Sequence, residues 1–227
     1  MNAEDLHKVH PGTLRDIVIH EQCSCGTGCP AVAGISAQRM RSRIVRHCSP
    51  TLAGLKCGSM FKMCGLDPDD IENVLSEELS RHHDRGLMYE VLNRDGCGTL
   101  IYIYRPRLLS DRLSESGVWD LLSDLGYTDR SVDGLIRRLK GRFDEPGMPP
   151  EVGIFLDYPL EDVLGYMQNG GRDCRVIGCW KVYGDVDAAE RRFRSYRHCR
   201  DVFMRRLSEG SDLGRLVVRC RSEPGVQ

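Results

Sequence analysis

Apolar side chains recur at helical spacing in several stretches of the chain. In a helix, residues three and four positions apart share a face, so this spacing predicts amphipathic helices that bury one side. The stretches with this pattern are 37–47, 69–82, 116–125, 132–143, 160–168 and 185–207.

Residues that typically begin helices precede several of these stretches. Ser36 and Asp185 stand at N-cap positions, and Asp67-Pro68 combines an N-cap with proline at the first helical position. The same signal, Ser49-Pro50, predicts a further short helix that begins directly after Cys48.

Shorter runs rich in β-branched and aromatic residues predict strands. Residues 87–92 and 99–104 flank the turn-forming sequence NRDGCG, which predicts a β-hairpin. The apolar run 152–158 predicts a buried strand, and 175–183 and 216–218 predict two more. This order of elements predicts an α+β fold, in which a small four- to five-stranded sheet packs with about six helices.

Composition divides the chain into three parts. Residues 1–33 form a cysteine-rich leader, residues 34–209 are expected to form a single α+β domain, and residues 210–227 are expected to be a partly disordered tail. A chain of 227 residues is long enough to bury a sizeable core.

The overall charge and hydropathy favour a cytoplasmic protein. The formal net charge is -1, so no global field attracts nucleic acid or anionic lipid. No run approaches the roughly 18 apolar residues that a membrane helix needs, and the first residues lack the apolar core of a signal peptide. We therefore expect no membrane partner.

One helix face is strongly basic despite the near-zero net charge. It carries Arg191, Arg192, Arg194, Arg197, Arg200, Arg205 and Arg206. Such a stripe suits phosphate or an acidic partner, but the near-zero net charge favours a solvated helix face offset by nearby acids. A nucleic-acid partner is not expected.

The first candidate site is a cysteine cluster in the leader. Eleven cysteines is a high number for a cytoplasmic chain, and an odd number argues against a complete disulfide framework. Cys23, Cys25 and Cys29 lie in one glycine-rich loop, and three thiols so placed suit zinc or an iron–sulfur cluster. The alternative is a cysteine-rich segment without metal, because the C-x-C-x3-C spacing is not a standard one.

The second candidate is Cys48. A helix N-terminus stabilises a thiolate, so the helix start predicted at Ser49-Pro50 makes Cys48 a candidate nucleophile. The alternative is a buried structural cysteine at the helix entry.

The third candidate is a group of aromatic residues, Tyr158, Tyr166, Trp180 and Tyr183. They are suited to line a pocket for a small ligand, with packing in the core as the alternative. The chain has no glycine-rich motif of the kind that cradles phosphate, so no motif supports nucleotide binding.

Three segments, HCSPTLAGLK, PEVGIFLDYPLEDVLGY and CWKVYGD, resemble a bacterial family named domain of unknown function family 3793. The resemblance covers roughly residues 35–203 and implies a host among anaerobic bacteria, with no established activity. One departure is Pro149-Pro150-Glu151, which stands where the family often has Pro-His-Glu.

These observations favour a cytoplasmic binding or accessory protein of anaerobic metabolism. The sheet and its flanking helices are expected to form the pocket or docking surface for a protein or small-molecule partner. The alternatives are a thiol-dependent enzyme that uses Cys48, and a carrier of zinc or an iron–sulfur cluster that uses Cys23, Cys25 and Cys29.

Overall fold

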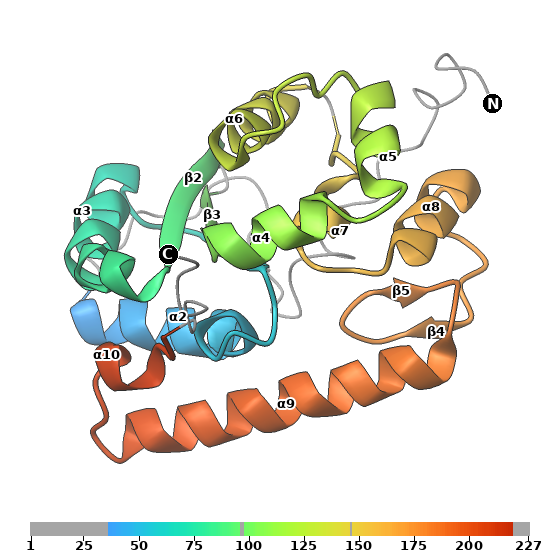
Figure 1. Cartoon of the computed structure of the whole chain (residues 1–227). Coiled ribbons are helices and arrows are strands. Elements are labelled where there is room, and N and C mark those ends of the chain that lie inside the picture. Colours follow the sequence, from blue (N-terminus) through green and yellow to red (C-terminus); the bar gives the residue numbers. More distant parts are fainter. Residues whose placement is uncertain (1–35, 96–97, 146, 220–227) are drawn as a thin grey trace, which may run out of the picture.

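The computed structural model describes residues 36–95, 98–145 and 147–219, and Figure 1 shows how their elements are arranged. The leader and its candidate metal ligands Cys23, Cys25 and Cys29 lie outside these residues. So does part of the predicted hairpin turn.

A three-stranded antiparallel sheet forms the centre of the fold. Its order is β1-β3-β2, with β1 at Gly58–Met63, β2 at Met88–Asp95 and β3 at Gly98–Tyr104. β2 and β3 form the hairpin that the sequence predicted, and β1 pairs with the other edge of β3. β3 is therefore the central strand, and β2 is an edge strand.

Helices cover both faces of this sheet. Alternate side chains of β3 point to opposite faces, so each face has apolar side chains that pack against helices. Leu100 and Tyr102 enter one hydrophobic core, and Ile101 and Ile103 enter another. The first core is closed by α4 (Pro106–Leu113), α5 (Val118–Asp124), α6 (Val132–Arg142), α7 (Val152–Phe155) and α8 (Leu160–Asn169). The second is closed by α2 (Ala37–Leu52), α3 (Pro68–Leu79) and α10 (Leu213–Leu216), and a 3-10 turn, η2 (Ser80–Arg85), leads from α3 to β2.

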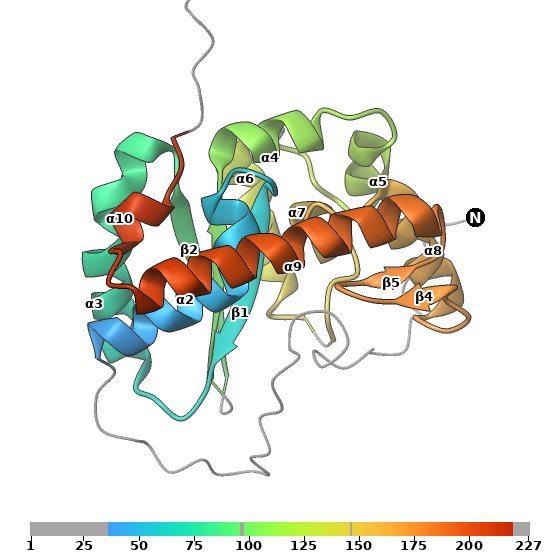
Figure 2. The same cartoon turned by 90° about the horizontal axis from the view of Figure 1, so that it is seen from below.

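The long helix α9 (Val186–Ser208) connects the two cores. Its first half contributes Phe193 and Tyr196 to the first core, and its second half contributes Cys199 and Phe203 to the second. Figure 2 shows α9 crossing the molecule alongside α2 and the small ribbon of β4 (Val176–Ile177) and β5 (Lys181–Val182).

The helices predicted to begin after Ser36, Asp67 and Asp185 are confirmed. The side chains of Ser36, Asp67 and Asp185 accept backbone hydrogen bonds at the starts of α2, α3 and α9. Such caps satisfy N–H groups that have no partner within the helix, so they fix where each helix begins.

The fold is α+β as predicted, but the number of strands and helices differs. The central sheet has three strands, a separate two-stranded ribbon replaces the predicted strand 175–183, and the described residues form nine α-helices. The predicted strand 152–158 is instead α7 followed by a turn. A fully buried apolar run of this length has no polar face, so its periodicity does not distinguish a strand from a helix.

The helix predicted to begin at Ser49-Pro50 is also wrong. α2 continues through Pro50 to Leu52, and the strand β1 follows. The residues on either side of this proline are buried, and the guanidinium of Arg105 donates to the carbonyls of Thr51 and Leu52. Packing at the end of α2 thus outweighs the cost of a proline inside a helix.

Residues beyond the expected domain boundary at 209 are part of the packed structure. The predicted strand 216–218 does not form, because α10 ends at Leu216 and no strand follows it in the described residues, and Leu213, Leu216 and Val217 are buried against α2 and its neighbours. Arg85 donates hydrogen bonds to the carbonyls of Gly214 and Val217. Within the described residues, no helix has the length and apolar character needed to cross a membrane.

Candidate functional site

A groove open to solvent runs along β2 at the edge of the sheet, between α3 and α6. Its floor is formed by six successive positions, 89–94. Its walls are formed by Glu72 on α3, Lys140 on α6 and Asp144 just after α6. These residues lie far apart in sequence, and the fold brings them together at one strand edge.

The outer edge of β2 has no backbone partner in the described part of the chain. β3 occupies the inner edge, and no backbone hydrogen bond from any other described element reaches positions 89–94. The pairing contains a bulge between Val91 and Asn93, and the Asn93 amide donates to the Phe143 carbonyl at 2.7 Å. The edge strand is thus fixed in place, while its outward N–H and C=O groups have no backbone partner among the residues that the structure describes.

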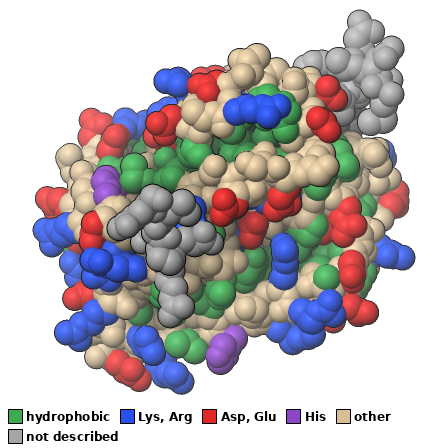
Figure 3. Space-filling view, in the orientation of Figure 1, with side chains coloured by type: hydrophobic (Ala, Val, Ile, Leu, Met, Phe, Trp, Pro, Cys, Tyr) green, Lys and Arg blue, Asp and Glu red, His purple; other side chains and the backbone are tan. Residues whose placement is uncertain are grey.

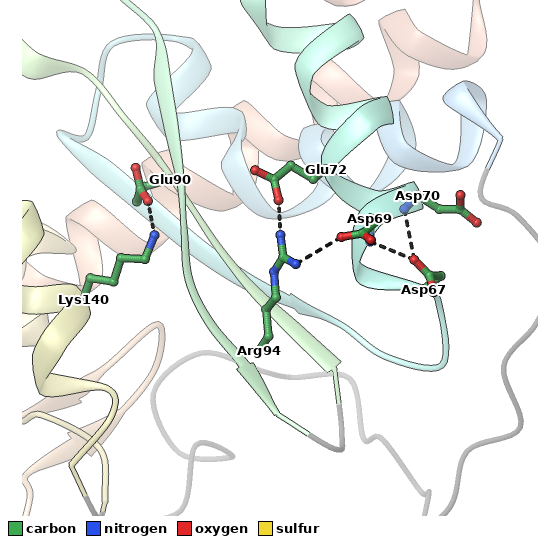
Figure 4. A network of polar contacts seen from close by, with 7 residues as sticks. All are labelled: Asp67, Asp69, Asp70, Glu72, Glu90, Arg94 and Lys140. Atoms are coloured by element: carbon green, nitrogen blue, oxygen red, sulfur yellow. Dashed lines mark hydrogen bonds and ion pairs between the residues drawn. The ribbon is translucent and has the colours of Figure 1, made fainter.

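Ion pairs hold both walls of the groove against β2 (Figure 4). On one side, Arg94 contacts Glu72 and lies 3.2 Å from Asp69, both on α3. On the other side, Lys140 Nζ lies 2.6 Å from Glu90 Oε1. Asp67 caps the first turn of α3, which places Asp69 beside Arg94.

The groove carries an excess of negative charge. The lining includes three carboxylates, Glu72, Glu90 and Asp144, against the two cations Arg94 and Lys140, so the net charge of the lining is -1. Asp144 is exposed and forms no ion pair with another described residue. A positively charged group is therefore the complementary ligand for this surface.

Cys48 lies elsewhere, in the core on the α2 side of the sheet. It is completely buried near the C-terminal end of α2, and burial raises the pKa of its thiol. The helix start that would have stabilised a thiolate at this position does not exist. These surroundings are those expected for a buried structural cysteine.

No described residues form a group suited to a metal. Among them, no three His, Cys, Asp or Glu side chains are arranged to hold an ion. Metal binding by Cys23, Cys25 and Cys29 stays a prediction, because the leader lies outside the described residues.

Three of the four aromatic candidates are brought together. Tyr158, Tyr166 and Trp180 line a small apolar pocket between α7, α8 and the β4–β5 ribbon, whereas Tyr183 is not part of its lining. The pocket also contains Asp162, which is buried and accepts a hydrogen bond from Trp180 Nε1 at 2.7 Å and from the N–H groups that follow β5. Sequence reasoning missed Asp162, because nothing local marks an acid in the first turn of a helix as buried.

The arginines of α9 are exposed or paired locally. Arg194 lies 3.5 Å from Glu190, Arg200 lies 3.6 Å from Asp201, and Arg192 donates to the Asp157 carbonyl. In Figure 3 basic and acidic side chains are interspersed along this side of the molecule. The observed mixture of charges favours a solvated helix face.

Comparison with known proteins gives one result. The family model described as "Protein of unknown function (DUF3793)" matches residues 44–217. Neither the curated proteins nor the solved structures contain a match to this chain. The matched region contains the whole central sheet, the groove along β2 and the buried residues of both cores except Met40. The chain therefore belongs to the DUF3793 family.

Proposed function

We propose that the protein binds an extended, positively charged segment of a partner protein, which pairs with β2 as an additional strand. The observation that carries the proposal is the open outer edge of β2 within a groove of net negative charge. Backbone hydrogen bonds give such strand addition its affinity, and side-chain contacts at the walls give it specificity.

The dimensions of the groove suit a short peptide segment. Six residues of β2 line the floor, which corresponds to about 20 Å at about 3.3 Å per residue. Charged side chains and bulges also protect strand edges from unwanted pairing. In this groove, the walls formed by α3 and α6 would exclude another sheet and admit a single strand. The charge of that strand would have to be opposite to the charge of the groove.

The proposal is tested by selecting binders from a displayed library of random peptides. The peptides have about ten residues, so they are longer than the strand with which they would pair. The full chain is the bait. Selected peptides are expected to contain Lys or Arg, and a synthetic copy is expected to slow amide hydrogen exchange at positions 88–95. Selection of no peptide above background, or protection confined to other parts of the chain, would refute it.

A pair of charge variants separates groove binding from general attraction. Asp144→Lys reverses a charge in the groove, whereas Asp124→Lys makes the same change on α5, outside the groove lining. The first is expected to weaken peptide binding about five-fold, since an exposed ion pair contributes up to about 1 kcal/mol. Equal weakening by both variants would contradict the assignment of the site.

A further inference from the structure

Successive side chains of β2 point alternately to the two walls of the groove. Residues that lie opposite each other in neighbouring strands share a face of the sheet, so the pairing with β3 assigns each residue of β2 to one wall. Tyr89 is opposite Ile103, which belongs to the core closed by α3. Glu90 is opposite Tyr102, which belongs to the core closed by α6. Tyr89 therefore points toward α3, and Glu90 points toward α6.

The bulge in β2 changes this alternation. Glu90 and Asn93 are three positions apart, so in a regular strand they would point to opposite walls. Their partners in β3 are only two positions apart and belong to the same core. The extra residue in β2 thus turns Asn93 to the same wall as Glu90. Their contacts agree with this assignment, because Glu90 pairs with Lys140 on α6, and Asn93 donates to the carbonyl of Phe143, the residue after α6.

The α6 side of the groove carries the net negative charge of the lining. Glu90 and Lys140 offset each other across 2.6 Å, whereas Asp144 forms no ion pair with another described residue. Asp144 directly follows Phe143, whose carbonyl accepts from Asn93 at 2.7 Å. A basic side chain that points to this wall beside Asn93 would therefore meet a carboxylate that has no cation of its own.

The lining on the α3 side is balanced in charge and more apolar. Figure 4 shows Arg94 on this side of β2, where it contacts Glu72 and lies 3.2 Å from Asp69, which is outside the lining. The two carboxylates thus share one guanidinium. Val91 and Tyr89 line the groove on the same side, one strand position and three strand positions from the level of Asn93. Apolar side chains pair favourably with such neighbours across strands.

We infer that the partner segment places a lysine or arginine beside Asp144 and apolar residues at the positions one and three away from it. This inference rests on the proposed function, because it requires an additional strand on β2. Positions at odd separations in a strand point to opposite walls, so the basic residue faces α6 while the apolar residues face Val91 and Tyr89 on the α3 side. Asp144 is then the residue that selects the basic position.

Two peptides of equal composition and charge, both acetylated and amidated at their ends, test this arrangement. In VTVKVTV all valines point to the wall opposite the lysine in either strand direction, whereas in VTKVVTV most of them share its wall. Fluorescence anisotropy of the labelled peptides measures binding to the full chain, and amide exchange at positions 88–95 locates it. VTVKVTV is expected to bind at least about five-fold tighter, since an exposed ion pair alone contributes up to about that factor.

A charge swap tests whether Asp144 selects the basic position. Asp144→Lys is expected to reverse the preference, so that this variant binds VTVEVTV about five-fold tighter than VTVKVTV. Asp70→Lys is the matched control, because Asp70 is also exposed but lies on α3 outside the groove lining. It is expected to keep the preference of the wild-type chain for VTVKVTV.

The outcomes separate this inference from the proposed function. Equal affinity of VTVKVTV and VTKVVTV would overturn the inference, and so would a charge preference that Asp144→Lys leaves unchanged. Failure of both peptides to bind, while peptides selected from the library protect positions 88–95, would also overturn it and leave strand addition in place. If no peptide from either source protects these positions, the proposed function fails together with the inference.

Discussion

Replacing Arg105 by alanine tests how the end of α2 and the C-terminal segment are held in place. The Arg105 side chain is fully buried and donates hydrogen bonds to four backbone carbonyls. Two belong to Thr51 and Leu52 in the last turn of α2, one to Arg85 and one, at 2.8 Å, to Val218. A cation at a helix C-terminus also interacts favourably with the helix dipole.

The expected loss of stability follows from these contacts. A hydrogen bond to a charged group contributes about 1.5–3 kcal/mol, and a buried acceptor left without a partner costs about 1–3 kcal/mol. The losses are not additive, and removing a buried charge recovers part of its desolvation cost. We therefore expect Arg105→Ala to lower the free energy of unfolding by about 4 kcal/mol and the melting temperature by about 8–16 °C.

Urea unfolding followed by circular dichroism measures this change. Arg105→Lys keeps the charge but not the planar array of donors, so about half of the loss is expected. Arg191→Ala, on the exposed face of α9, is the control and is expected to change stability by less than about 0.5 kcal/mol. A decrease in the free energy of unfolding of less than about 1 kcal/mol for Arg105→Ala would mean that the carbonyls find other partners. That result would refute the reasoning.

Four further outcomes are expected. Asp162→Asn should lower the free energy of unfolding, measured in urea, by about 2 kcal/mol. The amide group of the new side chain would face N–H groups that now donate hydrogen bonds to the carboxylate. A chain ending at Gly210 should unfold at a lower urea concentration than the full chain, since it lacks the buried residues of α10, and an unchanged midpoint would contradict their role. Iodoacetamide should label the exposed Cys179 well before Cys48, whereas rapid labelling of Cys48 in the folded protein would revive the thiol-dependent alternative. The stability of the wild-type chain should rise with pH below the ordinary lysine pKa, because the folded state binds fewer protons than the unfolded state in that window. Lys56→Met should remove this rise, and parallel pH profiles of the two proteins would refute the expectation.

The sequence predictions are correct where the residues that determine a feature lie close together in the chain, and they fail where those residues lie far apart. Ser36, Asp67 and Asp185 each cap a helix through a hydrogen bond to a residue two or three positions away, and all three were predicted. The apolar run 152–158 was wrongly predicted to be a strand. There the chain forms α7, and Asp157 takes a left-handed conformation that no local pattern signals.

The functional surfaces depend on contacts between distant parts of the chain. The hairpin of β2 and β3 was predicted, but β1 was not, so the order of strands and the open edge of β2 were not foreseen. Cys48 was wrongly placed at a helix start, because burial of Pro50 against the rest of the core keeps α2 continuous. Lys56 lies in a turn and its amino group contacts the rings of Tyr158, after α7, and Tyr196, on α9, which no spacing in the sequence relates.

The α+β class, the helices capped by Ser36, Asp67 and Asp185 and the central hairpin were predictable from the sequence alone, because these features depend on caps, turns and periodicity within a few residues. The three segments that resemble the family were also visible there, and the family match confirms them. The position of β2 at the sheet edge between two helices, the burial of Cys48 and the contact of Lys56 with the rings of Tyr158 and Tyr196 are visible only in the folded chain. These features arise from packing between residues that are remote in sequence, and burial and charge at a site are properties of that packing.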